Sequence, residues 1–115
     1  MVTPTLQQEV TQLEANFCAA LSDPSRLLIL YALSEASRNV TELANELELN
    51  QPTTSRHLKI LRERGLVNTV RTGTVITYHL SDSRLIQALD IMRSIMRDRL
   101  AYQASLINET AQETV

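Results

Sequence analysis

The stretch that decides the fold is Gln51-Pro52-Thr53-Thr54-Ser55-Arg56-His57-Leu58-Lys59-Ile60-Leu61-Arg62-Glu63-Arg64-Gly65. At about 100° per residue, Thr54, Leu58 and Leu61 fall on one side of a helix. Beside Ile60, the other side carries polar and charged positions: Thr53, Arg56, Lys59 and Glu63. Such a helix buries one stripe and presents a cationic, hydrogen-bonding face, so nucleic acid is the leading candidate partner.

A shorter helix is predicted directly before this stretch. Val40-Thr41-Glu42-Leu43-Ala44 opens it, with Thr41 as the expected cap, and Asn50 is expected to cap the second helix. Residues 40–65 therefore predict a helix-turn-helix, in which the second helix enters a DNA major groove about 12 Å wide.

A β-hairpin is predicted after it, over residues 66–80. The chain has two glycines: Gly65 fits a left-handed helix C-cap, and Gly73 lies between the β-prone runs 66–70 and 75–80. These runs alternate like a half-buried hairpin, whose tip would carry Arg71 toward phosphate or the minor groove. The predicted fold is mainly α with a small β-hairpin: a winged helix-turn-helix of about five helices and a two-stranded wing.

The flanking segments predict three further helices in a single domain over 1–115. Apolar residues at steps of three and four indicate a helix over 5–21, and Ser22-Asp23-Pro24 starts another over 24–36 that is apolar nearly all round and hence central. A last helix over 83–107 has an apolar stripe, and the polar tail after Asn108 is expected to fray.

The apolar stripes of 5–21 and 83–107 exceed what one small core covers. The favoured interpretation is that they pair with the same helices of a second chain in a homodimer. The alternative, that they pack on each other within one chain, stays open.

Charge and composition narrow the partners and the compartment. The net charge is −2, but residues 51–80 carry +4 and the rest −6, and such local charge suits a phosphate backbone because attraction fades within about 10 Å. No apolar run approaches the roughly 20 residues of a membrane span, and no secretory signal is expected. A single cysteine, Cys18, favours a reducing cytoplasm.

The order of elements and several local motifs resemble the ArsR/SmtB family of bacterial repressors. The motifs are Phe17 with Leu21 and Asp23-Pro24-Ser25-Arg26-Leu27; Val40 with Glu42-Leu43-Ala44; Gln51-Pro52-Thr53 with Ser55-Arg56-His57-Leu58 and Leu61; and Arg62 with Gly65-Leu66-Val67. The resemblance covers roughly residues 13–100. It implies a homodimeric winged helix that represses by occupying a double-stranded DNA operator and is released by an inducer.

The resemblance also implies which residues contact DNA. Base-reading and backbone contacts fall on Gln51, Thr53, Ser55, Arg56 and His57. An arginine such as Arg56 can grip guanine with two hydrogen bonds. Better placed for phosphate, which positions a protein without reading sequence, are Lys59, Arg62, Arg64 and Arg71.

The sensing sites familiar in this family are missing, so no metal and no cofactor is expected and the inducer is unknown. The positions of its thiol site hold Asn39 and Thr41, and those of its zinc site hold Asp82, Arg84, Ile95 and Asp98. His57 and His79 are interpreted as structural or surface residues rather than ligands. Cys18 has two interpretations: a buried, inert thiol, or a redox switch that forms an intermolecular disulfide.

Two functions from different classes remain. The first is a sequence-specific DNA-binding transcriptional regulator; the alternative is a winged-helix protein-interaction module without direct DNA binding. The local +4 charge favours DNA. An enzyme is not expected, because the sequence has no acid–base pair, Cys/His dyad, glycine-rich phosphate loop or metal quartet in recognisable spacing.

Overall fold

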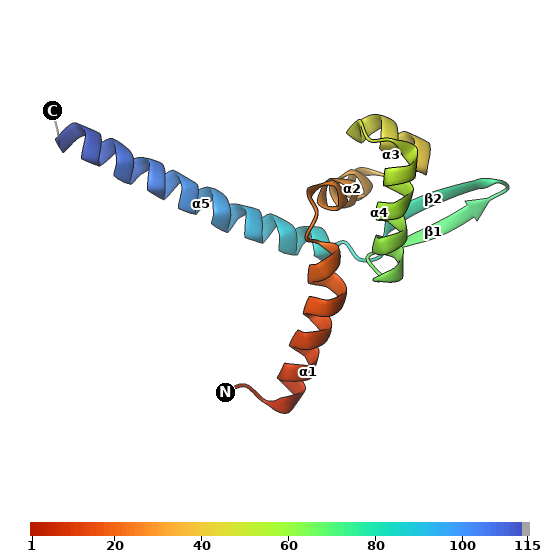
Figure 1. The fold of residues 1–115 in the computed structure, drawn as a ribbon, viewed down its shortest axis with the longest axis horizontal. Coiled ribbons are helices and arrows are strands. Elements are labelled where there is room, and N and C mark those ends of the chain that lie inside the picture. The colour runs from red at the N-terminus through yellow and green to blue at the C-terminus, as the bar shows by residue number, and fades with distance from the viewer. Residues whose placement is uncertain (114–115) are drawn as a thin grey trace. The chain divides into compact units, whose positions relative to one another are not determined.

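The computed structural model describes residues 1–113, which form helices and one hairpin (Figure 1). Their order is α1 (Pro4–Leu13), η1 (Glu14–Cys18), α2 (Pro24–Glu35), α3 (Val40–Leu47), α4 (Gln51–Glu63), β1 (Val67–Thr72), β2 (Val75–Leu80) and α5 (Arg84–Glu113). The predicted winged helix-turn-helix is confirmed. The chain divides into two compact units, Met1–Ser83 and the segment that begins at Arg84. The assignment of 1–115 to a single domain stays a prediction.

The helix-turn-helix begins two residues before its predicted cap, Thr41. Asn39 is the N-cap of α3: its Oδ1 accepts from the Glu42 amide at 2.8 Å, and its own amide donates to Glu42 Oε1 at 3.0 Å. A cap at Thr41 would place Ala44, which has no side-chain acceptor, at the reciprocal position. The prediction of Thr41 was therefore wrong, because the Asn39–Glu42 capping box satisfies two amides at once.

A tight turn places α4 after α3. Glu48 ends α3 in the left-handed conformation, with φ of 55°, and the Leu49 amide donates to Ala44 O at 2.9 Å. Asn50 then caps α4, as predicted, by accepting from the Thr53 amide at 2.8 Å. Because both helix ends are satisfied within three residues, the angle between α3 and α4 is fixed locally.

The core lies where α2, α3, α4 and the base of the hairpin meet. Fully buried are Ile29, Leu30, Leu43, Leu58, Leu61 and Val67. The predicted inward stripe of α4 is confirmed, since Thr54 is also buried and its hydroxyl donates to Asn50 O at 2.9 Å. The central role of α2 is confirmed as well, but the helix is not apolar-buried all round, because Leu28 is 54% exposed.

Gly65 ends α4 and begins the connection to the wing. Its φ is +77°, its amide donates to Arg62 O at 3.1 Å, and the Leu66 amide donates to Leu61 O at 2.9 Å. This pair of bonds is the Schellman arrangement that a left-handed residue permits. The Ser81 hydroxyl donates to Gly65 O at 2.7 Å, so the strand that returns from the wing is tied to the same corner.

The wing is an antiparallel pair whose register runs from Val67↔Leu80 to Thr72↔Val75 around a two-residue turn. The first strand runs to Thr72 rather than to the predicted Val70. Half-burial holds only at the base, because Val70, Val75 and Ile76 are all exposed. The base is anchored by backbone bonds between Arg38 and Tyr78, at 3.1 and 2.8 Å. The distal hairpin consequently stands free of the core within its unit.

The first helix corresponds to the predicted 5–21, but its second half was not foreseen. η1 is a π-helical turn, and the α-helical repeat resumes at Ala19. Residues 1–19 are exposed, including the predicted stripe of Leu6, Val10, Leu13 and Phe17. Within the unit Met1–Ser83, this apolar stripe is not buried by any other segment.

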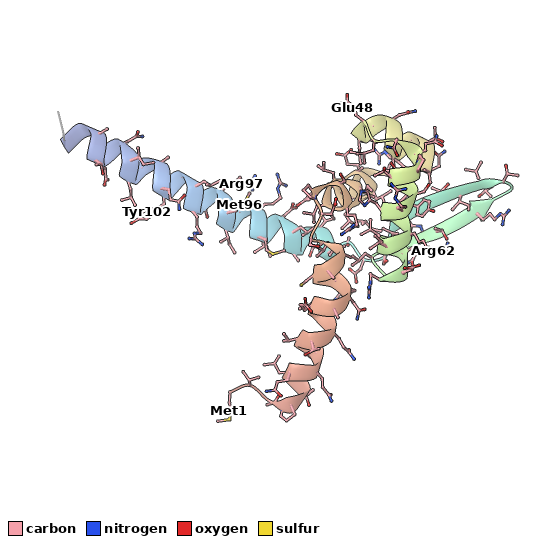
Figure 2. All side chains as sticks on the ribbon, in the orientation of Figure 1. Met1, Glu48, Arg62, Met96, Arg97 and Tyr102 are labelled. Atoms are coloured by element: carbon pink, nitrogen blue, oxygen red, sulfur yellow. The ribbon has the colours of Figure 1, made fainter. Side chains whose placement is uncertain are left out.

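The second unit is one long helix, α5. The predicted end at 107 was wrong, since the helix continues to Glu113. The fraying expected after Asn108 stays a prediction, and residues 114 and 115 lie outside the described residues. Residues 109–113 contain no glycine or proline, and Glu, Ala and Gln are good helix formers. Exposed apolar side chains, Met96 and Tyr102 among them, project along the helix (Figure 2). None of the helices within residues 1–113 combines the length and apolarity needed to cross a bilayer.

We expect Gly65→Ala to lower the free energy of unfolding by about 1–2 kcal/mol, the cost of a left-handed conformation for a residue with a Cβ. No heavy atom lies within 4 Å of a Cβ built there, so the loss reflects backbone strain and not a clash. Gly65→Asn is the matched control and should lose less, because asparagine tolerates this conformation. Urea denaturation measures both; an alanine variant as stable as the wild type would contradict the assignment.

Candidate nucleic-acid interface

The N-terminal half of α4 carries most of the predicted base-reading residues. Gln51, Ser55 and Arg56 are exposed, and Thr53 is half-buried. The helix presents this side because Thr54, Leu58 and Leu61 are held in the core on the opposite side. In Figure 1, α4 runs from the end of α3 to the base of the hairpin.

Two of these side chains are oriented by threonine hydroxyls. Gln51 Nε2 donates to Thr41 Oγ1 at 3.0 Å, and Arg56 Nη2 donates to Thr53 Oγ1 at 3.1 Å. Gln51 keeps its carbonyl oxygen and a second N–H, and Arg56 keeps four of its five N–H donors. Both side chains are therefore held in place with donors left for a ligand.

The predicted phosphate-contacting cations fall into two groups. Lys59 and Arg62 are exposed on α4, with Arg62 near its C-terminal end (Figure 2). Arg71 is exposed on β1 opposite Ile76, in the second pair from the turn rather than at the tip, and its Nε donates to Gly73 O at 3.2 Å. Arg64 differs, because its Nη1 donates to Asn16 Oδ1 of η1 at 3.2 Å.

His57, which was also predicted to contact DNA, is mostly buried. Its side chain is 14% exposed, and Nδ1 lies 3.4 Å from Arg26 Nη1 while Nε2 lies 4.0 Å from Asp23 Oδ1. The structure thus turns His57 toward the start of α2. Sequence reasoning did not single out Arg26 as its partner, because a contact between α2 and α4 leaves no periodic signal.

The structural role of Arg38 was also missed by the sequence analysis. Its Nε lies 2.5 Å from Glu46 Oε2, and its Nη1 donates to the carbonyls of Ala32 and Ala36. With 16% of its side chain exposed, it caps the C-terminus of α2 and ties it to α3. A cation directly after a helix end is a recognised signal for this, so the sequence contained it.

Asp23 caps α2 by accepting from the amides of Ser25 at 2.8 Å and Arg26 at 3.3 Å. Partial burial raises the pKa of its carboxyl, but these two hydrogen bonds, with the charges of His57 and Arg26, lower it by more. The pKa of Asp23 therefore lies below its ordinary value of 3.8.

Cys18 is exposed on η1, so the predicted burial of its thiol within its own chain was wrong, while its inertness stays a prediction. The thiol is exposed because the whole of residues 1–19 stands outside the core. Its redox role stays a prediction. His79 is half-buried on β2, opposite Asn68. Among residues 1–113, no group of three or more His, Cys, Asp or Glu side chains is arranged to hold a metal ion.

Comparison with known proteins places this surface in a family. Residues 23–69, which span α2 to the start of the wing, match the model of the bacterial regulatory proteins of the arsR family. A biofilm growth-associated repressor of Agrobacterium fabrum is 36% identical over 89 residues, which cover 75% of each chain. The chain belongs to the ArsR/SmtB family.

Other relatives of this ArsR/SmtB protein extend the match. The nodulation protein NolR of Rhizobium meliloti is 34% identical over 95 residues, covering 83% of this chain and 78% of NolR. The crystal structure of NolR from Sinorhizobium fredii is 34% identical, with a TM-score of 0.71 over 83% of this chain and 94% of NolR. A homodimeric winged helix-turn-helix DNA-binding domain from Mycobacterium bovis is 25% identical, with a TM-score of 0.75 over 87% and 92%.

These matches decide between the two functions left open by the sequence. The ArsR/SmtB protein is a DNA-binding transcriptional regulator and not an enzyme, and the alternative of a protein-interaction module is not supported.

We expect the stability that Asp23 contributes to be lost in acid. A carboxyl whose pKa is lower in the folded state stabilises the protein above its unfolded pKa, and that contribution disappears as pH falls through the folded pKa, below 3.8. Asp23→Asn keeps a capping oxygen but no charge. Its melting temperature should lie below that of the wild type at pH 7, with the gap closing toward pH 3. A gap that is constant with pH would contradict the assigned charge.

Proposed function

We propose that the chain is a homodimeric repressor that occupies a double-stranded DNA operator with α4 in the major groove. The observation that carries this proposal is the exposed hydrogen-bonding and cationic side of α4, on a helix whose opposite side is fully buried. The net +4 of residues 51–80 in a chain of −2 supplies local attraction for phosphate.

Within this proposal, the residues divide into base-reading and backbone-contacting sets. Gln51, Thr53, Ser55 and Arg56 read base edges from the N-terminal half of α4, where Arg56 can bond guanine O6 and N7 together. Lys59, Arg62 and Arg71 contact phosphate. We leave out His57, because its side chain is 14% exposed and faces Arg26. Arg64 is exposed and keeps donors beyond its bond to Asn16, so it belongs with the phosphate-contacting set.

The exposed apolar stripes support the homodimer. On α5, Met92, Ile95, Met96 and Leu100 are each more than half exposed, and α1 exposes Val10 and Leu13 similarly. Contiguous apolar surface of this kind is covered by a partner in soluble proteins. A twofold dimer also explains the function, because it presents two copies of α4 to two half-sites about one helical turn of DNA apart. The Mycobacterium bovis domain of the same fold is homodimeric.

The release signal is not assigned. The sequence positions of the family's thiol site and zinc site hold residues that do not suit metal binding of either kind. Titration of the purified protein on its own promoter DNA with metals, oxidants and persulfides would test the remaining chemical classes.

We predict that Arg56→Ala and Arg71→Ala weaken DNA binding in different ways. Arg56→Ala should cost about 1–3 kcal/mol on a preferred duplex and little on random DNA, because it removes a base contact. Arg71→Ala should weaken both duplexes alike and lower the slope of log K against log salt by about one unit. Fluorescence anisotropy across a salt series measures both, and equal losses on both duplexes for both variants would overturn the division of roles.

We predict that Met96→Glu dissociates the dimer. Met96 is 54% exposed and lies within the apolar stripe of α5, so a buried, unpaired carboxylate at the interface would be costly. Ser94→Glu is the matched control, because it adds the same charge on the opposite side of the same helix. Light scattering during size-exclusion chromatography should give monomer mass for Met96→Glu and dimer mass for Ser94→Glu; a dimeric Met96→Glu would exclude this face from the interface.

A further inference from the structure

Arg26 connects three helices through one guanidinium. It lies in the first turn of α2, its Nε donates to Ala20 O at 2.6 Å, and its Nη2 lies 3.5 Å from Ala19 O. These two carbonyls end the first helix. The third nitrogen, Nη1, reaches His57 Nδ1 of α4 at 3.4 Å. A single side chain therefore joins the end of the first helix to α4.

The contact between Arg26 and His57 is a hydrogen bond only when His57 Nδ1 is the acceptor. Arginine has donors and no acceptor, so this bond requires an Nδ1 that carries no proton. The ring proton is then on Nε2, which faces the carboxylate of Asp23 at 4.0 Å. If His57 becomes doubly protonated, Nδ1–H meets the Arg26 guanidinium, so a hydrogen bond is replaced by a contact between two cations.

We propose that Arg26 and His57 act as positioning residues, which set the rotation of α4 and couple it to the end of the first helix, and that this coupling requires a neutral His57. The proposal rests on the proposed function, since it concerns how α4 is presented to DNA. Neither residue is assigned a contact with DNA.

The position of His57 on α4 suits this role. It lies at the edge of the buried stripe, between Leu58 on the core side and Thr53 on the exposed side. The leucine contacts of the stripe are non-directional, whereas a hydrogen bond is directional and resists rotation about the helix axis. A small rotation of α4 moves Thr53 and, through their bond, Arg56. The Arg26–His57 bond therefore acts on the orientation of the base-reading side more than on folding.

Two charged groups face His57 from α2 and its cap, Asp23 and Arg26. On α4, the positions one turn away carry no charge: Thr53, Thr54, Ile60 and Leu61. Because the pKa of Asp23 lies below its ordinary value, that carboxylate stays ionised between pH 5.5 and pH 8.0. A change in DNA discrimination over this interval is therefore not caused by protonation of Asp23.

The test uses the full-length protein and two duplexes of about 30 base pairs, one selected by the wild type from a random-sequence pool and one scrambled from it. The measured quantity is the ratio of their dissociation constants, by fluorescence anisotropy at pH 8.0 and pH 5.5. Four variants are compared: His57→Asn places an amide oxygen near the position of Nδ1, His57→Leu removes the acceptor, Arg26→Lys keeps the charge but not the fork, and His79→Asn removes the other histidine.

We expect the wild-type ratio to fall about tenfold between pH 8.0 and pH 5.5, equivalent to about 1.4 kcal/mol. His57→Asn should keep the high ratio at both pH values, and His79→Asn should follow the wild type. His57→Leu and Arg26→Lys should have the low ratio already at pH 8.0, while they bind the scrambled duplex like the wild type. Circular dichroism at both pH values identifies any variant that fails to fold.

The possible outcomes distinguish a failure of this inference from a failure of the proposed function. A wild type that does not discriminate between the duplexes at pH 8.0 contradicts the proposed function itself. If the wild type discriminates but its ratio is constant with pH, or if folded His57→Leu or Arg26→Lys equals it at pH 8.0, the coupling is wrong and the function stands. Should the leucine and lysine variants not fold, His57→Asn decides alone, because a wild-type pH profile in that variant also overturns the proposal.

Discussion

The burial of one side of α4 is the constraint on which the rest of the structure depends. Thr54, Leu58 and Leu61 are all sealed in the core, and the one polar member is satisfied by donating to Asn50 O. The burial of this side decides which residues the other side of the helix presents. The exposed side of α4, and so the interface with DNA, follows from the packing of three residues. Caps at Asn50 and Gly65 then set where that side begins and ends.

The attraction for DNA depends on the local charge of α4 and the wing and not on the net charge of the chain. A protein of net charge −2 is a poor polyanion binder on average, yet its cations are concentrated on α4 and the wing. Screening limits each charge to about 10 Å, so the acidic remainder contributes little at the interface. Within the cationic set the structure also separates arginines by their contacts. Arg26 and Arg38 are half-buried and bond to protein groups, whereas Arg56, Arg64 and Arg71 are exposed, each with one bond within the protein and donors remaining.

The sequence predicted features that depend on local periodicity and missed those that depend on distant contacts. The inward stripe of α4, the Asn50 cap and the turns at both glycines are consequences of neighbours in the chain, and each was found. The cap at Asn39 was missed although its partner Glu42 is local, because Thr41 is also of a residue type that is preferred at helix N-caps. The orientation of His57 could not be found, since it depends on Arg26 of another helix. Cys18 is exposed because residues 1–19 lie outside the core of their own chain, which the periodicity of the sequence does not reveal.

The central claim is that DNA is contacted by the exposed side of α4 together with the wing. Chemical-shift mapping of the ¹⁵N-labelled protein, titrated with the duplex selected from a random pool, tests it most directly. The largest changes in amide and arginine side-chain signals should fall on residues 51–59 and around Arg71, with small changes in the buried part of α2. Changes confined to α1 and α5, with the α4 signals unmoved at saturating DNA, would contradict it.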